Sequence, residues 1–169
     1  MAHHLRPRGP LSVRNSVPRG CRTLDGIATL TITRGLPASG KTTWARRQRG
    51  AVRVNRDDLR RMLHGGWSGR GWAEVQVTIA QRAQIEALLK AGVNVISDDT
   101  NLAGRVVKEL SDLAGECGAT VVIKDFTDVP LETCLARDAE RDGDDKVGED
   151  SIRAMYRRYL ARDHAKEDP

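Results

Sequence analysis

Residues 35–42 read Gly35-Leu36-Pro37-Ala38-Ser39-Gly40-Lys41-Thr42 and match the pattern G-x-x-x-x-G-K-[ST] in full. A β-rich run over 27–33 leads into this stretch, and a helical pattern near 41–49 follows it. In that setting the glycines let the backbone wrap a polyphosphate so that successive N–H groups point inward. The alternative is a Gly-rich turn that happens to end in Lys-Thr, and the flanking strand and helix argue against it. The stretch therefore predicts a binding site for a nucleoside triphosphate.

The residue types in this stretch predict individual roles. Lys41 is expected to reach the β- and γ-phosphates, and the Thr42 hydroxyl to ligate Mg²⁺. ATP and Mg²⁺ are therefore the expected cofactors, although the pattern does not name the acceptor of a phosphate. The residues expected to bind the nucleotide are Gly35, Pro37, Ala38, Ser39, Gly40, Lys41, Thr42 and Thr43.

Strand and helix signals alternate along the rest of the chain. Alternation of this kind predicts a parallel sheet with helices on both faces. We therefore expect an α/β fold of the phosphate-loop NTPase type, with about four strands in the order 2-3-1-4 and a C-terminal lid. Further strands are expected over 51–55, 93–97 and 120–126, a loop over 64–72, and helices over 57–63, 73–90, 106–117, 130–141 and 152–160.

The composition fits one folded domain behind a basic tail. The chain has 169 residues, of which 39% are hydrophobic and 30% are charged. The first 24 residues carry five arginines and no acid, whereas residues 25–169 balance 23 basic against 23 acidic side chains. We predict a disordered basic tail over 1–26 and one domain over 27–165 that is not uniformly basic.

The cysteines and the hydropathy pattern indicate a cellular compartment. Cys21, Cys117 and Cys134 show no C-x-x-C spacing, which indicates reduced thiols. No apolar run approaches the roughly 20 residues that a membrane span needs. We therefore expect a cytoplasmic protein without a membrane partner.

A second polar block, NRDDLRR over 55–61, follows the second expected strand and so lies at the carboxyl edge of the sheet. Phosphoryl transfer to a hydroxyl needs a carboxylate that orients the hydroxyl and accepts its proton. Asp57 and Arg60 are three residues apart and share a helix face, so Arg60 could hold a phosphate of the acceptor. The alternative is an N-capping Asp57 on a solvated helix face.

A third block, VISDDTNL over 95–102, is an apolar strand that ends in two acids. An Asp at this place commonly holds Mg²⁺ or its water shell. Asn101 could cap the helix that follows.

Arg137 and Arg141, four residues apart before a charged loop, could close over the phosphates as a lid. An exposed helix face is the alternative, because Asp138, Glu140 and Asp142 lie between and beside them.

Taken together, these blocks resemble the 5′-polynucleotide kinases of bacteriophage and bacterial nucleic-acid repair. The likeness spans about residues 27–160, and the combination of the second and third blocks is the most specific part of it. The blocks that carry it are GLPASGKTTW (35–44), VNRDDLR (54–60), ISDDTNL (96–102), CLARDAERDG (134–143) and SIRAMYRRYL (151–160).

The resemblance implies a role for each matching position. Asp57 would be the general base, and Lys41 and Arg141 would act on the migrating phosphoryl group. Arg137 would contact the nucleotide. Asp99, the acid of the third block, would join Thr42 at the metal, with Asp98 as an extra acid beside it. The residues implied for the nucleic-acid substrate are Asp57, Arg60, Asp99 and Thr100.

The implied function is transfer of the γ-phosphate of ATP, or of another nucleoside triphosphate, to the 5′-hydroxyl end of RNA or DNA. No D-x-D motif follows an apolar strand, so we expect no phosphatase activity and infer a separate ligase and phosphatase as partners. A run of arginines over 46–61 suits a nucleic-acid groove. Two alternatives stay open: a kinase of a small-molecule hydroxyl, and a nucleic-acid-binding switch that binds ATP without transferring phosphate.

Overall fold

The computed structural model describes residues 26–67 and 69–161, and the predicted tail lies, except for Gly26, outside them. The extent of the domain over 27–165 stays a prediction. Strands and helices alternate as expected. The elements are β1 (Thr29–Arg34), α1 (Lys41–Arg47), β2 (Val52–Val54), α2 (Arg56–His64), α3 (Gly71–Lys90), β3 (Val95–Ser97), α4 (Gly104–Glu116), β4 (Thr120–Asp125), α5 (Leu131–Ala139), the 3-10 turn η2 (Gly143–Asp145) and α6 (Glu149–Tyr159).

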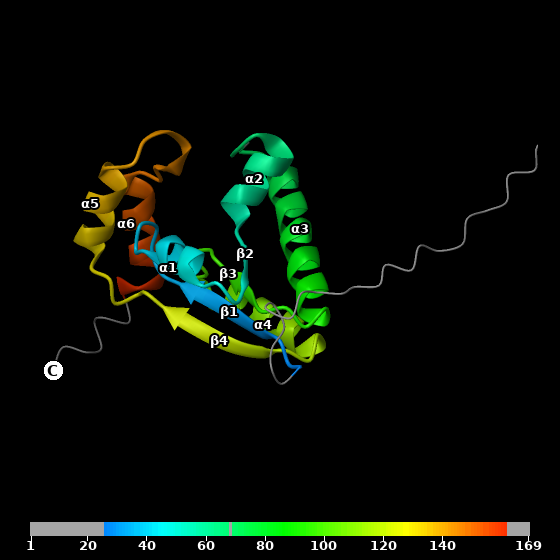
Figure 1. Cartoon of the computed structure of the whole chain (residues 1–169). Coiled ribbons are helices and arrows are strands. Elements are labelled where there is room, and N and C mark those ends of the chain that lie inside the picture. The colour runs from blue at the N-terminus through cyan, green and yellow to red at the C-terminus, as the bar shows by residue number, and fades with distance from the viewer. Residues whose placement is uncertain (1–25, 68, 162–169) are drawn as a thin grey trace, which may run out of the picture.

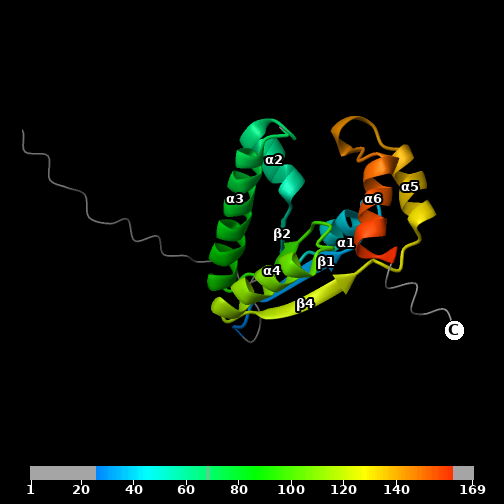
Figure 2. The same cartoon turned by 180° about the vertical axis from the view of Figure 1, so that it is seen from behind.

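The four strands form one parallel sheet in the order β2-β3-β1-β4, which confirms the predicted order. Strand β1 is central, with Leu30 beside Val95 of β3 and beside Val121 of β4. Figures 1 and 2 show α1 on one face of the sheet and α4 on the other, as predicted. Because the strands are parallel, their carboxyl ends meet at one edge, where the phosphate-binding loop follows β1.

Two hydrophobic clusters hold the helices in place. The larger one joins the sheet to α3 and α4, with Leu30, Ile32, Val77, Ile85 and Leu110 buried within it. The smaller one joins the phosphate-binding loop and the loop after β3 to the last two helices, and consists of Leu36, Leu102, Cys134, Ile152 and Leu160. The second cluster therefore fixes α5 and α6 against the loop that was predicted to bind phosphate.

Helices stand at both ends of the sheet. In both views α2 and α3 rise at one end, while α5 and α6 rise at the other (Figures 1 and 2). The loop predicted over 64–72 is shorter than expected, because α3 begins at Gly71. The predicted cap at Asn101 is wrong: Ala103 is the N-cap of α4, and the Asn101 amide instead donates to the Thr33 carbonyl at 2.9 Å.

Among residues 26–67 and 69–161, no helix combines the length and the apolar composition needed to cross a bilayer.

Two isoleucines of α3 provide a matched test of the core. Ile85 is fully buried, whereas Ile79 is 61% exposed. We expect Ile85→Ala to lower the free energy of unfolding by about 2–5 kcal/mol, because the substitution leaves a cavity between α3 and the sheet. Ile79→Ala should change it by less than about 0.5 kcal/mol. Urea denaturation followed by circular dichroism measures both, and equal effects would contradict the packing of α3.

Candidate active site

The phosphate-binding loop needs glycine at both glycine positions of its pattern. Gly35 has φ 152°, and a Cβ there would meet Phe126 Cβ, the Phe126 carbonyl and Ser39 Oγ at 3.0 Å. Gly40 has φ 98°, a left-handed conformation, and immediately precedes α1. No side chain of the described residues caps α1, so its first N–H groups are open to an anion.

Lys41 lies folded into the loop. Its ammonium donates to the Gly35 carbonyl at 3.0 Å, the Leu36 carbonyl at 2.5 Å and Ser39 Oγ at 3.2 Å. Burial lowers the pKa of Lys41 to about 8, and the nearby carboxylate of Asp98 opposes that shift. A buried ammonium held only by neutral oxygens is ready to exchange them for phosphate oxygens.

Asp98 directly follows β3. It is 1% exposed, and neither carboxylate oxygen has a hydrogen-bond partner among the described residues. Arg53 Nη1 lies 3.5 Å from Asp98 Oδ2. Burial raises the pKa of Asp98. The nearby Thr42 hydroxyl and the charge of Arg53 oppose this shift and lower the pKa. A buried, unsatisfied carboxylate beside the Thr42 hydroxyl fits a bound cation or its water shell.

Asp99 faces the other way. Its Oδ1 accepts from the Arg56 backbone N–H at 3.0 Å and its Oδ2 from Gln81 Nε2 at 2.6 Å. Burial raises its pKa to about 6. Both oxygens of Asp99 are therefore engaged by α2 and α3, and its expected place beside Thr42 at the metal stays a prediction. Successive side chains after a strand point to opposite sides, so Asp98 reaches the loop and Asp99 reaches α2 and α3.

Helix α2 carries both Asp57 and Arg60, which were predicted to share one helix face. Arg60 Nη1 donates to Asp57 Oδ1 at 2.5 Å across one helical turn. The Asp57 side chain is 67% exposed. The N-cap is Asn55, which accepts from the Asp58 N–H at 3.0 Å, so the N-capping alternative for Asp57 is wrong. Asp57 is therefore free to meet a ligand at the carboxyl edge of the sheet.

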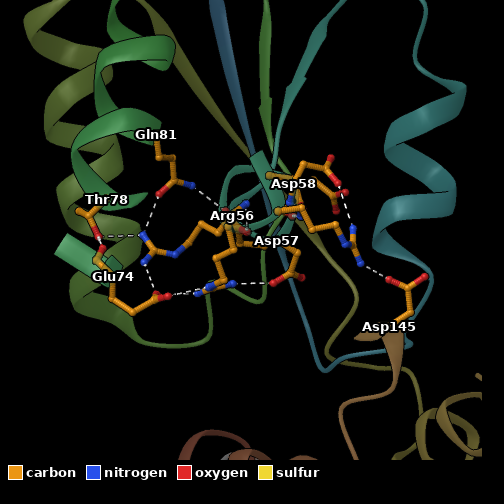
Figure 3. A network of polar contacts seen from close by, with 12 residues as sticks. Arg56, Asp57, Asp58, Glu74, Thr78, Gln81 and Asp145 are labelled. Carbon is orange, nitrogen blue, oxygen red and sulfur yellow. Dashed lines mark hydrogen bonds and ion pairs between the residues drawn. The ribbon is translucent and has the colours of Figure 1, made fainter. Parts of the chain in front are cut away.

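Glu74 on α3 organises this pair, and our sequence analysis missed it. Its carboxylate receives Arg60 Nε at 2.8 Å and Arg60 Nη2 at 2.7 Å, and also Arg56 Nη2 at 2.9 Å (Figure 3). Hydrogen bonds from Arg60, and then from Arg56, lower the pKa of Glu74 to about 2. Arg56 continues the network through Thr78 and Gln81 to Asp99 (Figure 3). No local spacing could reveal this contact, because Glu74 lies 14 residues from Arg60.

The lid segment is anchored by a buried acid. Asp138 is 2% exposed and accepts from the Val147 N–H at 3.1 Å and the Gly148 N–H at 2.8 Å. The exposed-face alternative is therefore wrong for this residue. Arg141 donates to the Asp145 carbonyl at 3.3 Å, and its charge contributes to lowering the pKa of Lys41.

The remaining predicted residues lie around the same edge. An ion pair between Arg61 and Asp145 joins α2 to η2 across the site (Figure 3). Arg137 is exposed and makes no hydrogen bond or ion pair with another residue of the described ranges. The Thr100 carbonyl accepts from the Gly35 N–H at 3.0 Å. Pro37, Ala38 and Ser39 are buried in the loop, and Thr43 is exposed on α1.

Known proteins resemble this chain in sequence and in fold. A family model described as "AAA domain" matches residues 30–162. A protein of Autographa californica nuclear polyhedrosis virus, described as a bifunctional polynucleotide kinase/RNA ligase, is 28% identical over 150 residues, which are 81% of this chain. A chain of the Pnkp1/Rnl/Hen1 RNA repair complex is 32% identical over 84% of this chain, with a TM-score of 0.71. A second structure of that complex gives 36% identity over 66% of this chain and a TM-score of 0.60.

These relatives confirm the resemblance to polynucleotide kinases that the sequence blocks predicted. The chain spans 22% of the length of the viral relative and 47% and 39% of the lengths of the two repair-complex chains. A further structure, that of APE1195, is 22% identical with a TM-score of 0.52 and supports the fold alone.

The Glu74 network makes stability depend on pH. The Glu74 pKa is about 2 in the folded chain against an ordinary value of 4.5, so its stabilisation is present above pH 4.5 and is lost as the pH falls towards 2. Glu74→Gln should lower the free energy of unfolding at pH 7 by about 2 kcal/mol, a figure that allows for solvent screening of a partly exposed group. It should also flatten the fall in stability below pH 4.5.

Urea denaturation at a series of pH values measures this effect. Glu86→Gln, which breaks an exposed pair with Lys90 on the same helix, is the control and should flatten the pH profile far less than Glu74→Gln, because the Glu86 pair is exposed to solvent. A Glu74→Gln profile that kept the full slope of the wild type would contradict the role assigned to Glu74.

Proposed function

The chain belongs to the AAA-domain family of phosphate-loop proteins, and from that premise we propose that it is a polynucleotide 5′-hydroxyl kinase. It transfers the γ-phosphate of ATP, or of another nucleoside triphosphate, to the 5′-hydroxyl end of RNA or DNA. The observation that carries this proposal is the exposed Asp57 carboxylate, paired with Arg60 at the sheet edge that also holds the phosphate-binding loop. On an acceptor that carries both a hydroxyl and a phosphate, a carboxylate can accept the hydroxyl proton and a guanidinium can bind the phosphate.

Asp57 acts on the acceptor hydroxyl. It orients the 5′-oxygen for in-line attack and takes its proton as the new O–P bond forms. The bond between the γ-phosphorus and the β–γ bridging oxygen breaks, and the nucleoside diphosphate leaves. Because Asp57 is exposed and held on one side only by Arg60, one carboxylate oxygen is available for that hydroxyl.

Arg60 recognises the phosphate on the 3′ side of the first nucleotide. A guanidinium has five N–H donors, and Glu74 and Asp57 accept three of them. The remaining two face no acceptor within the described part of the chain and suit a phosphate. Glu74 therefore serves as a positioning residue that holds Arg60 beside Asp57. Thr100 and Asp99 border the acceptor side of the site.

The donor nucleotide binds on the loop side. The loop backbone and Lys41 hold the β- and γ-phosphates, while Arg141 and the exposed Arg137 approach from the lid. Mg²⁺ would be held by Thr42 and Asp98, which is the pair that fits it. A cation there neutralises phosphate charge, and Mg²⁺ in such sites needs only one or two protein ligands besides phosphate and water.

The description of the viral relative joins a polynucleotide kinase with an RNA ligase, and this supports a 5′-phosphorylated end that passes to a ligase, here proposed as a separate protein. A separate phosphatase and a cytoplasmic location, as expected from the sequence, belong to the same proposal. Contacts to backbone phosphates rather than to base edges imply little sequence preference.

Transfer of label from γ-labelled ATP to a 5′-hydroxyl oligonucleotide tests the proposal. Asp57→Asn should lower the turnover number by about 10²–10⁴-fold, the usual contribution of a general base. The neighbouring Asp58→Asn is the matched control, because Asp58 binds Arg53 and Arg61 and not the acceptor, and it should keep near wild-type turnover.

Either of two outcomes would contradict this proposal. Labelling of a small hydroxyl compound but of no oligonucleotide would identify a small-molecule kinase. ATP-dependent oligonucleotide binding without any labelling would identify a binding switch.

Substitutions of the neighbouring acids Asp98 and Asp99 should change the Mg²⁺ dependence of transfer differently. We expect Asp98→Asn to raise the Mg²⁺ concentration for half-maximal transfer about tenfold, a typical loss for a metal-site residue. Asp99→Asn should leave that concentration unchanged and raise the KM of the acceptor, because Asp99 contacts α2 and α3. Activity measured over a Mg²⁺ titration decides the assignment, and the reverse pattern would restore Asp99 as the metal residue.

A further inference from the structure

A cavity with no role in the reaction above lies on the acceptor side of the site. Its volume is about 720 Å³, within the range of sites for small molecules or short polymer segments. Its walls come from the start of α2, from α3, the loop after β3, α4 and α6, and Figure 2 shows these helices from behind the sheet. Asp99 and Thr100 form the border that it shares with the site of transfer.

Arginines from four helices line this cavity. They are Arg56 of α2, Arg82 of α3, Arg105 of α4 and Arg158 of α6, and the only acids in the lining are Asp99 and Glu109. Both acids are already occupied: Asp99 accepts from the Arg56 N–H and from Gln81, and Glu109 accepts from Arg105 at 3.0 Å. The cavity therefore carries more positive charge than its own carboxylates neutralise.

Two of these arginines make no hydrogen bond or ion pair with a carboxylate of the described residues, although Arg82 lies close enough to Glu86 for its charge to lower the pKa of that carboxyl. Arg82 makes no hydrogen bond or ion pair with any residue in 26–67 or 69–161. Arg158 lies over the ring of Tyr159, with its guanidinium carbon 5.2 Å from the ring centroid, and has no carboxylate partner in those ranges. Guanidinium groups beside a cavity whose two acids already bind other donors suit phosphate oxygens.

The cavity lies next to the proposed acceptor site, because Arg56 of its lining shares Glu74 with Arg60. Arg56 lines the cavity, and its Nη2 shares Glu74 Oε2 with Arg60 Nη2, at 2.9 Å and 2.7 Å. A strand whose first phosphate lies at Arg60 can therefore continue past Arg56 into the cavity. The Tyr159 ring adds an aromatic surface to this path, as in many sites for single strands.

We propose that this cavity binds the phosphodiester backbone of the acceptor strand downstream of its first phosphate, through Arg82 and Arg158. The inference rests on the proposed function and deepens it, because it makes the substrate a polymer rather than a phosphorylated nucleoside. It places recognition on the backbone and gives no base-specific contact.

A series of 5′-hydroxyl acceptors of increasing length tests the inference. The series runs from a nucleoside 3′-monophosphate through di- and trinucleotides to a hexanucleotide. With the wild type, the KM should fall as the acceptor lengthens. Arg158→Glu and Arg82→Glu should each raise the KM of the hexanucleotide about tenfold, the loss of one charge-assisted contact, and leave the KM of the nucleoside 3′-monophosphate unchanged.

Arg157→Glu is the matched control. Arg157 is the exposed neighbour of Arg158 on α6 and does not line the cavity, so this variant carries the same charge change outside the path. It should keep the wild-type KM for every acceptor. Equal thermal midpoints of the three variants confirm that each one folds.

Direct binding separates this inference from the proposed function. Anisotropy of a labelled 5′-hydroxyl hexanucleotide, measured over a salt series, should show Arg158→Glu binding more weakly, with a logarithmic salt slope lower by about 0.7 for each lost phosphate contact. If no acceptor is phosphorylated but this binding difference persists, the kinase proposal fails and the cavity stands as a nucleic-acid site. A KM independent of acceptor length, or identical behaviour of Arg158→Glu and Arg157→Glu, would overturn the inference.

Discussion

The site depends on a buried pair of opposite charges where β1 and β3 end side by side. Lys41 and Asp98 are both almost fully buried. Lys41 donates hydrogen bonds only to neutral oxygens of the described residues, and the charged group nearest to Asp98 in an ion pair is Arg53 at 3.5 Å. Burying charge in this way costs stability unless a ligand compensates it. The parallel sheet on one side and the cluster around Leu36 on the other hold both groups in place. The chain thus keeps at one edge a cation and an anion that suit a phosphate and its metal.

A second set of contacts, separate from those of the phosphate-binding loop, organises the proposed acceptor side of the site. Asp99 and Glu74 do not face the phosphate-binding loop, and they tie α2 to α3 through Arg56 and Arg60. Arg60 is oriented by a bidentate pair with Glu74, which leaves its other edge for a phosphate and holds it against Asp57. Two adjacent acids after one strand therefore serve two different partners, because alternate side chains leave a strand on opposite sides.

The last two helices link both sides. The cluster of Leu36, Leu102, Cys134, Ile152 and Leu160 fixes α5 and α6 to the loops that follow β1 and β3. Asp138 binds the start of α6 from within the lid, and this contact holds Arg141 near Lys41. The opposite face of α6 carries Arg158 into the large cavity. Helix α6 therefore packs against the loops after β1 and β3 through Ile152 and lines the cavity through Arg158, which under the proposed function connects the donor side with the acceptor side.

Local patterns in the sequence by themselves determined the phosphate-binding loop, the alternation of strands and helices, and the pairing of Asp57 with Arg60. Each of these depends on residues within about one helical turn or on the sequence order of elements, which spacing records directly. Only the tertiary structure decided which acid after β3 faces the loop, that Glu74 holds two arginines, that Asp138 is buried, and that arginines from four helices meet in one cavity. These features arise from contacts between distant elements, and the direction of a side chain at such a contact is set by packing rather than by its neighbours in sequence.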